Sequence, residues 1–226
     1  MITVLDVETT FVVGENRRSD PSPFCPDNRL VSVQYSQNFQ KPEFVWFHHA
    51  KQNFNKIESS QKIQKILDST TLLVGHNIKF DLMWLLETGF TYNKKVYDTM
   101  LGEYMLLRGQ KWGISLADCC ARRNITLKKS ELVENYLKNG QGFDVIPMDM
   151  VEEYGKGDII STTELYFHLR AISGTGCLHS LTSAGLHPHP QGLLLTPHPH
   201  PYPLMTSPFN RLLQGHHLET QVKLDH

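Results

Sequence analysis

The chain has 226 residues, of which 40% are hydrophobic and 20% are charged. This composition predicts one domain of ordinary size with a substantial core, plus an extension. The 22 basic and 23 acidic residues give a net charge of −1, so net charge does not indicate a nucleic-acid-binding protein, although local patches decide such binding. The sequence has no secretory leader and no long apolar run. Secretion and membrane spanning are therefore not expected.

The first predicted element is an apolar strand over residues 2–10 that carries Asp6-x-Glu8. Side chains two apart on a strand share a face, so these carboxylates would point the same way, roughly 6 to 7 Å apart. Such a pair is typical of sites that hold two divalent cations around a phosphoryl group. A solvated strand end with two ordinary acids is the alternative that the segment alone leaves open.

The next elements indicate a mixed sheet. Residues 14–28 are rich in Pro, Ser and charge, and are long enough for a flexible flap. Residues 30–35 and 43–47 are β-rich runs suited to antiparallel pairing with the first strand. A helix is expected from about 55 to 67. This order predicts an α/β fold with three antiparallel strands first and helix crossovers later.

Residues 71–86 read as a strand that stops at Gly75 and enters a helix. Asn77 and Asp81 are four residues apart and would lie on one face of this helix or its cap. Asn77 suits the N-cap, and an acid such as Asp81 is favourable in a first helical turn. Plain capping and first-turn electrostatics therefore remain alternatives to a site.

Asp98 is a predicted helix cap, after which the pattern is mostly helical through Ile172. Within this region Tyr154 and Asp158 are four residues apart, about 6 Å along one helix face. Glycines at 155 and 157 each cost on the order of 1 kcal/mol in a helix, which favours a site over a scaffold. A loop around the glycines, with Tyr154 in the core, is the alternative.

From about Ser173 charged residues nearly vanish, and the repeats HPHPQG and PHPHPYP follow. Alternating proline prevents regular helix or central strand, so residues 173–226 are predicted to be a disordered or non-native tail. The histidines of the repeats are His187, His189, His198 and His200. A metal-binding tract there would lack the surrounding partners that orient ligands.

The three motifs together resemble the DEDD 3′-5′ exonucleases of the DnaQ-like, ribonuclease H-related superfamily. The matching segments are Asp6-x-Glu8, Asn77-x-x-x-Asp81 and Tyr154-x-x-x-Asp158. A sister branch has histidine five places before the last aspartate, where this chain has Glu153, so the tyrosine branch is favoured. The segments VGHNIKFDLMWLL, YDTMLGEYMLLRG and SLADCCARRNI look like the proofreading exonuclease domain of phage-type family A DNA polymerases. The resemblance covers about residues 1–172.

The resemblance implies a ribonuclease H-like sheet flanked by helices and a two-metal 3′-5′ exonuclease that uses Mg²⁺ or Mn²⁺. Its expected substrate is the 3′ end of single-stranded DNA, from which it releases nucleoside monophosphates. A DNA polymerase domain or subunit outside this chain is a possible partner, and no membrane partner is expected. The alternatives are an RNase D-like exoribonuclease and an inactive polymerase fragment. The cysteines form no Cys-x-x-Cys unit, which favours free thiols in the cytoplasm of a bacterial or phage-infected cell.

The carboxylates have distinct expected roles. Asp6, Glu8 and Asp158 would hold one cation that activates the attacking water. Asp6 and, through water, Asp81 would hold a second cation near the leaving oxygen. Tyr154 would orient the water, because a phenol that titrates near 10 is a poor base at neutral pH.

Substrate contacts are expected from Asn77, which would hold Asp81 or a sugar, and from the Thr9 backbone and Phe11 beneath the terminal nucleotide. Ordinary core packing is an equal alternative for Phe11. A basic cluster is a candidate for contact with backbone phosphates, and a solvated helix face is the alternative. Its members are Arg122, Arg123, Lys128 and Lys129.

Overall fold

The computed structural model describes residues 1–13, 19–125 and 131–182, with side chains described as far as Ile172. The strands of these residues are β1 (Ile2–Thr9), β2 (Val12–Val13), β3 (Ser19–Asp20), β4 (Leu30–Gln37), β5 (Glu43–Trp46), β6 (Leu72–Gly75) and β7 (Lys95–Asp98). The helices are α1 (Lys56–Ser69), α2 (Ile78–Glu87), α3 (Thr99–Leu106), α4 (Leu116–Arg123), α5 (Glu131–Lys138) and α6 (Met148–Thr182). The expectations for Lys128, Lys129 and the His-Pro repeats fall outside the described residues.

The main sheet has five strands in the order β5-β4-β1-β6-β7. Strands β5, β4 and β1 are antiparallel to one another, whereas β6 and β7 run parallel to β1. This topology confirms the predicted mixed sheet. Strand β7 was not assigned to particular residues from the sequence, because its run of four residues is too short for a periodic signal.

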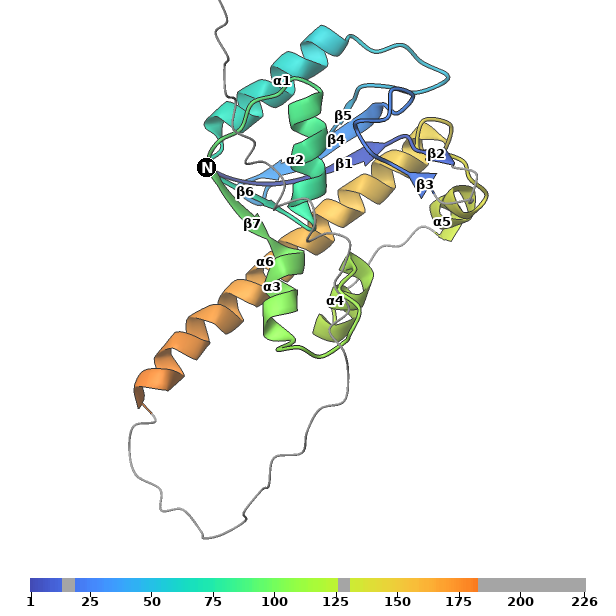
Figure 1. Cartoon of the computed structure of the whole chain (residues 1–226). Helices are drawn as coiled ribbons and strands as arrows, with labels where there is room; N and C mark the ends of the chain where they lie inside the picture. The colour runs from blue at the N-terminus through green and yellow to red at the C-terminus, as the bar shows by residue number, and fades with distance from the viewer. Residues whose placement is uncertain (14–18, 126–130, 183–226) are drawn as a thin grey trace, which may run out of the picture. The chain divides into compact units, whose positions relative to one another are not determined.

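The two faces of β1 are covered by different helices. Leu5 and Val7 belong to a core that includes residues of α1 and α2, such as Leu67 and Leu85. Val4 points to the opposite face and packs in a second cluster that includes residues of α6. The long helix α6 therefore crosses the sheet on the face opposite to α1 and α2 (Figure 1). Because side chains alternate along a strand, Asp6 and Glu8 share the α6 face with Val4.

Strand β1 extends past its parallel neighbour, since the pairing with β6 covers only Ile2 to Val4. The chain turns at Gly75 into α2 immediately afterwards. A Cβ at Gly75 would lie 2.4 Å from Ile78 Cδ1 and 3.1 Å from the Leu5 carbonyl oxygen. Glycine at this turn therefore lets the start of α2 approach the open edge of β1.

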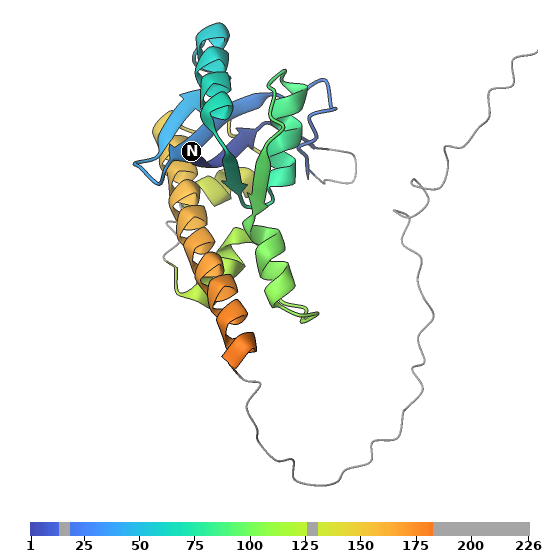
Figure 2. The ribbon, with the colours of Figure 1, turned by 90° about the vertical axis from the view of Figure 1, so that its left-hand side faces the viewer.

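The last part of α6 extends beyond the sheet and lies beside α3 and α4 (Figure 2). The helix ends at Thr182, ten residues beyond the boundary at Ile172 that the sequence predicted. The rest of the predicted tail, residues 183–226, lies outside the described residues. None of the described helices is both long and apolar enough to span a membrane.

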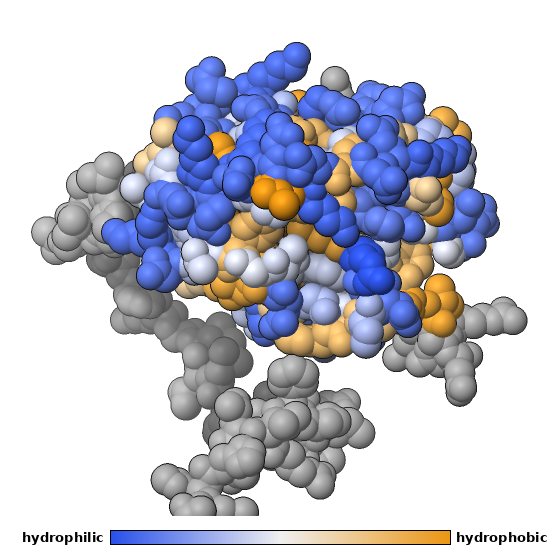
Figure 3. Space-filling view, turned by 90° about the horizontal axis from the view of Figure 1, so that it is seen from above, coloured by the Kyte–Doolittle hydropathy of each residue, from blue (hydrophilic) through white to orange (hydrophobic). Residues whose placement is uncertain are grey.

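The described part of the connection at residues 14–28 makes defined contacts. Strands β2 and β3 pair across it in a small antiparallel sheet. Asn28 Nδ2 donates to the Asp20 carbonyl oxygen at 2.8 Å, and Trp84 Nε1 donates to the Pro21 carbonyl oxygen at 2.9 Å. The first of these bonds lies within the connection and the second joins it to α2, and the flexibility of the segment stays a prediction. The molecular face in Figure 3 is mainly hydrophilic, with small separate apolar patches.

Candidate active site

Three carboxylates from β1 and α6 meet at the α6 face of the sheet. Carboxylate oxygens of Asp6, Glu8 and Asp158 all lie within 4.8 Å of one another. Glu8 is buried, and the other two are partly buried. The strand places the first two acids on one face, and the crossing of α6 brings in the third from 150 residues away. Their close approach to one another favours a cation-binding site over the solvated strand end.

Gln34 on β4 is a buried neighbour of these acids that was not singled out from the sequence. Its backbone is the register partner of Asp6 in the antiparallel pair, and its side chain is 0% exposed. Gln34 Nε2 donates to Asp6 Oδ2 at 2.5 Å and to Glu8 Oε1 at 3.4 Å. One sequence signal exists: Ser32, Gln34 and Ser36 are polar residues two apart on one face of β4.

Asp81 lies beside the three-carboxylate group but outside it. It is 2% exposed, and its Oδ1 accepts a hydrogen bond from the Val7 backbone N–H at 3.0 Å. That N–H is available because β6 ends before reaching this part of β1. Asp81, the fourth acid, is therefore carried by α2 and held in place by a backbone N–H of β1.

Burial dominates the electrostatics of these acids. Desolvation raises the pKa of Asp6 to about 6, and hydrogen bonds from Gln34 and the Val7 backbone oppose this shift. Desolvation, followed by repulsion from neighbouring carboxylates, raises the pKa of Glu8 well above its usual value. The pKa of Asp81 is raised for the same two reasons. Among the described residues Asp6, Glu8 and Asp81 form no ion pair, and the groups that donate hydrogen bonds to them, the Gln34 amide and the Val7 backbone N–H, are neutral.

Tyr154 lies on α6 one turn before Asp158, as the spacing predicted. Its ring packs against Phe143, with centroids 5.7 Å apart. Burial, then the charges of Asp158 and Glu8, raise the pKa of the Tyr154 phenol further above its ordinary value. Its hydroxyl forms no hydrogen bond with another described residue. The phenol is therefore protonated at neutral pH and can donate one hydrogen bond.

Asn77 occupies the N-cap position of α2, but in a left-handed conformation with φ of 61°. Its side chain makes no capping hydrogen bond and, among the described residues, none to Asp81. Instead its backbone N–H donates to Asp98 Oδ1 at 3.0 Å, and Asp98 also caps α3 as predicted. The expected side-chain capping is wrong, because the left-handed backbone turns the side chain away. A substrate contact by this exposed side chain stays a prediction.

A pocket of about 580 Å³ is lined by none of the four acids but by residues next to them in sequence or in packing. These include Thr9, which follows Glu8, and Phe143, which packs on Tyr154. Phe11 and Phe80 add two more aromatic rings to its wall. Phe11 is only half-buried, so it faces a pocket and is not in the described core clusters. The α5 side of this pocket, including Phe143, was missed because it carries no motif.

The two arginines of the predicted basic cluster form ion pairs within the protein. Arg123 Nε lies 2.8 Å from Glu103 Oε1, and Arg122 Nη2 lies 3.3 Å from Glu103 Oε2. Glu103 is fully buried beneath them. The phosphate-binding prediction for these two arginines is therefore not supported, since both guanidinium groups are bound to a buried carboxylate.

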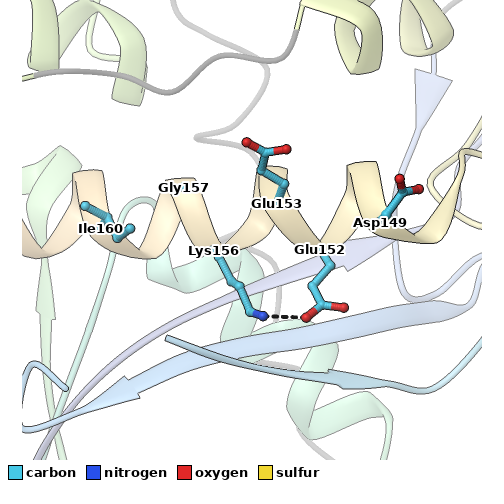
Figure 4. A pocket seen from close by; sticks show the side chains of 6 residues that line it. All are labelled: Asp149, Glu152, Glu153, Lys156, Gly157 and Ile160. Carbon is cyan, nitrogen blue, oxygen red and sulfur yellow. Dashed lines mark hydrogen bonds and ion pairs between the residues drawn. The ribbon is translucent and has the colours of Figure 1, made fainter. Parts of the chain in front are cut away.

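Glu153, the position of the histidine in the sister branch, points away from Glu152 (Figure 4). It lines a surface hollow of about 380 Å³ on α6, beside Asp149. Glu152 forms an ion pair with Lys156 on the same helix. This hollow includes none of Asp6, Glu8 and Asp158. The residue of this turn that feels the charges of these acids is Tyr154.

The donor set fits hard divalent cations. Carboxylate oxygens are the preferred protein ligands of Mg²⁺ and Mn²⁺. Three carboxylates lie close enough to share one ion. Asp6 and Glu8 are shielded from solvent and form no ion pair among the described residues, so a cation would neutralise their negative charge.

Known structures with similar folds include nucleases and a polymerase. Brucella melitensis NrnC with bound Mg²⁺ has a TM-score of 0.51 and 17% sequence identity, and the likeness covers 79% of this chain and 77% of that chain. Brucella melitensis NrnC bound to pGG has a TM-score of 0.52 and 17% identity, with 79% of this chain and 76% of that chain covered. The family B DNA polymerase of Pyrobaculum calidifontis has a TM-score of 0.50 and 15% identity, with 74% of this chain but 24% of the polymerase covered. At these identities the likeness shows the fold.

No curated protein sequence gives a significant match. A family model described as 3′-5′ exonuclease matches residues 21–172, more than half of the chain. The match includes the second and third motifs and begins after Asp6-x-Glu8, so the structure alone joins the first motif to the others. The chain belongs to the 3′-5′ exonuclease family, and its reaction is the hydrolysis of phosphodiester bonds.

Proposed function

We propose that this protein removes nucleotides from the 3′ end of single-stranded DNA with the help of two divalent cations, Mg²⁺ or Mn²⁺. The observation that carries this proposal is the meeting of Asp6, Glu8 and Asp158 within 4.8 Å, beside a protonated tyrosine and an open aromatic pocket. The context we propose is proofreading for a DNA polymerase domain or subunit outside this chain. The segments that resemble family A polymerases support that context.

Asp6, Glu8 and Asp158 would hold one cation, and Asp6 with Asp81 would hold the second. When bound, the cations would lower the pKa of the attacking water and neutralise charge at the scissile phosphate. Tyr154 would donate its hydroxyl proton to a hydrogen bond with that water and thereby fix its direction of attack. The raised pKa of the phenol makes proton abstraction by Tyr154 unfavourable at neutral pH.

The aromatic pocket would receive the terminal nucleoside. Bases stack on aromatic side chains with little sequence preference, worth roughly 1–3 kcal/mol per base. Phe11 and Phe143 line this pocket together with Thr9, the residue that follows Glu8. An exonuclease that must accept every base fits this kind of recognition. Asn77 is a proposed contact to the sugar at the exposed start of α2.

The test uses single strands of DNA and RNA with the same sequence and a 5′ label. We expect the full-length protein with Mg²⁺ to shorten DNA one nucleotide at a time and to stop when EDTA is added. The Asp158→Asn protein, purified identically, controls for contaminating nucleases. A faster digestion of RNA would replace this proposal by an exoribonuclease. Digestion that survives EDTA or Asp158→Asn would contradict it.

A further inference from the structure

We propose that Gln34 is a positioning residue that holds Asp6 and Glu8 in one arrangement for cation binding. This inference rests on the proposed function of the same site and assigns a task to a residue outside the three motifs. Gln34 does so from the neighbouring strand, where the antiparallel register places it directly opposite Asp6.

The amide has one N–H for each carboxylate. Its Nε2 lies 2.5 Å from Asp6 Oδ2 and 3.4 Å from Glu8 Oε1. A primary amide carries two N–H donors on the same nitrogen, so both carboxylates can be bound at once. Because Gln34 is 0% exposed, solvent does not compete for these donors. The spacing of the two acids is therefore set by one rigid planar group.

Ser32 anchors the oxygen end of the amide. Its Oγ–H donates to Gln34 Oε1 at 3.2 Å, two residues earlier on the same strand face. A flipped amide would turn its oxygen towards two carboxylates and its N–H groups towards Ser32. Ser32 is also 0% exposed, so this donor has no solvent alternative. The carboxylates, which only accept hydrogen bonds, select the orientation in which the N–H groups meet them, and the Ser32 hydroxyl holds the oxygen end of the amide in place.

Helix α6 closes the third side of the amide. A Cβ at Gly155 would lie 2.9 Å from Gln34 Cδ and 3.1 Å from its Nε2. Glycine is unfavourable in a helix interior, but here it lets the α6 backbone pack directly on the amide. The helix turn that carries Tyr154 and Asp158 is thereby held against the same group that holds the β1 acids.

A neutral donor suits this task better than a cationic one. Lysine or arginine at this position would form an ion pair with the acids and compete with the divalent cation. The amide offsets part of the desolvation of the carboxylates and leaves their charge available. Partners that orient metal ligands in this way typically change metal affinity by about 10–100-fold when removed.

The test measures Mn²⁺ binding to the full-length protein by isothermal titration calorimetry, without substrate. Gln34→Met keeps the length of the side chain but removes both donors, and we expect its Kd to rise by about 10–100-fold. Gln37→Met is the matched control on the same strand, because Gln37 Nε2 donates only to exposed Ser69 Oγ, at 3.1 Å. Its Kd should equal that of the wild type. The melting temperature in EDTA verifies that each variant is folded.

Ser32→Ala provides a second, milder variant. We expect weaker Mn²⁺ binding in the wild-type background and no further weakening in Gln34→Met, because Ser32 acts through the amide. If Gln34→Met does not fold, Ser32→Ala decides alone, and an unchanged Kd there overturns the inference. Wild-type protein that binds no Mn²⁺ overturns the proposed function itself. Wild-type binding with an equal Kd in Gln34→Met overturns only the role of Gln34.

Discussion

The protein buries carboxylates in two ways. Glu103 is fully buried between α3 and α4, where Arg122 and Arg123 both form ion pairs with it. Arg122 also donates to the Gly113 carbonyl oxygen and lies over the Trp112 ring. This carboxylate has its counter-charges within the chain.

The acids of β1 are buried without such counter-charges. Asp6 and Glu8 accept hydrogen bonds from the neutral amide of Gln34, and Asp81 accepts one from a backbone N–H. Desolvation accordingly dominates their pKa shifts. The comparison teaches that burial alone does not separate a structural acid from a catalytic one. The charge of the partner does, because a carboxylate without an internal cation must take up a proton or bind an external cation.

The largest expected effect is on activity. Replacing any one of the four acids by alanine should lower the exonuclease rate by on the order of 10³-fold or more, and double changes should add little, since the acids act as one unit. The variants are Asp6→Ala, Glu8→Ala, Asp81→Ala and Asp158→Ala. Single-turnover digestion of labelled DNA measures the rate. An Asp6→Ala protein with near wild-type activity would remove the site assignment.

Glu103→Gln should act on stability instead. It leaves two partly buried guanidinium groups without their carboxylate, which should lower the free energy of unfolding by about 3 kcal/mol. Urea unfolding measures this loss. Asp6→Asn is the matched change at the other site and should not destabilise the metal-free protein, because it removes crowded negative charge. Equal losses in the two variants would abolish the proposed distinction between the sites.

Tyr154→Phe should reduce the rate by roughly 10- to 1000-fold, less than loss of an acid, because it removes the hydrogen bond to water but no carboxylate. Mn²⁺ affinity should scarcely change. The exonuclease rate and the Mn²⁺ affinity, measured together, separate a role in orienting the water from a role in binding the metal. A large drop in Mn²⁺ affinity would assign Tyr154 to the metal site instead.

The metal-free protein should lose stability as pH rises from about 4 to above 6. Burial raises the pKa of Asp6 to about 6, so the folded state binds more protons than the unfolded state in this window. Stability then falls with rising pH, by on the order of 1–3 kcal/mol for this group. Thermal melts in EDTA at several pH values test the slope, which Asp6→Asn should reduce. Mn²⁺ should restore stability at pH 7, because it binds the folded state. A slope of the opposite sign would contradict the burial argument.

The smallest effect is expected from shortening the chain. Residues 183–226 are poor in charge and rich in proline and histidine, so their composition gives no periodic apolar face to pack. A chain that ends at Thr182 should keep its melting temperature and its nuclease rate. Limited proteolysis of the full chain should yield a similar fragment. A large loss of stability on truncation would show that the predicted tail packs on the nuclease.

Local pattern predicted much of the fold and part of the site. The strand that carries Asp6 and Glu8, the turn at Gly75 and the cap at Asp98 depend on neighbouring residues, and all three are present. The N-cap of α1 at Asn55 is also local. By contrast, the left-handed backbone at Asn77 depends on Asp98, 21 residues later. The order around residues 19–28 depends on Trp84, from a distant helix.

By itself the sequence determined which carboxylates share a strand face or a helix face, because these periodicities are fixed by backbone geometry within a few residues. Only the tertiary structure decided which charges meet. The register of β4 against β1 placed Gln34 opposite Asp6, and the crossing of α6 brought Asp158 to both. The same packing placed Arg122 and Arg123 in ion pairs with Glu103. Among the described residues it placed no cationic side chain in an ion pair with the acids of β1. Charge pairing over long separations depends on how elements dock, and no local pattern encodes that.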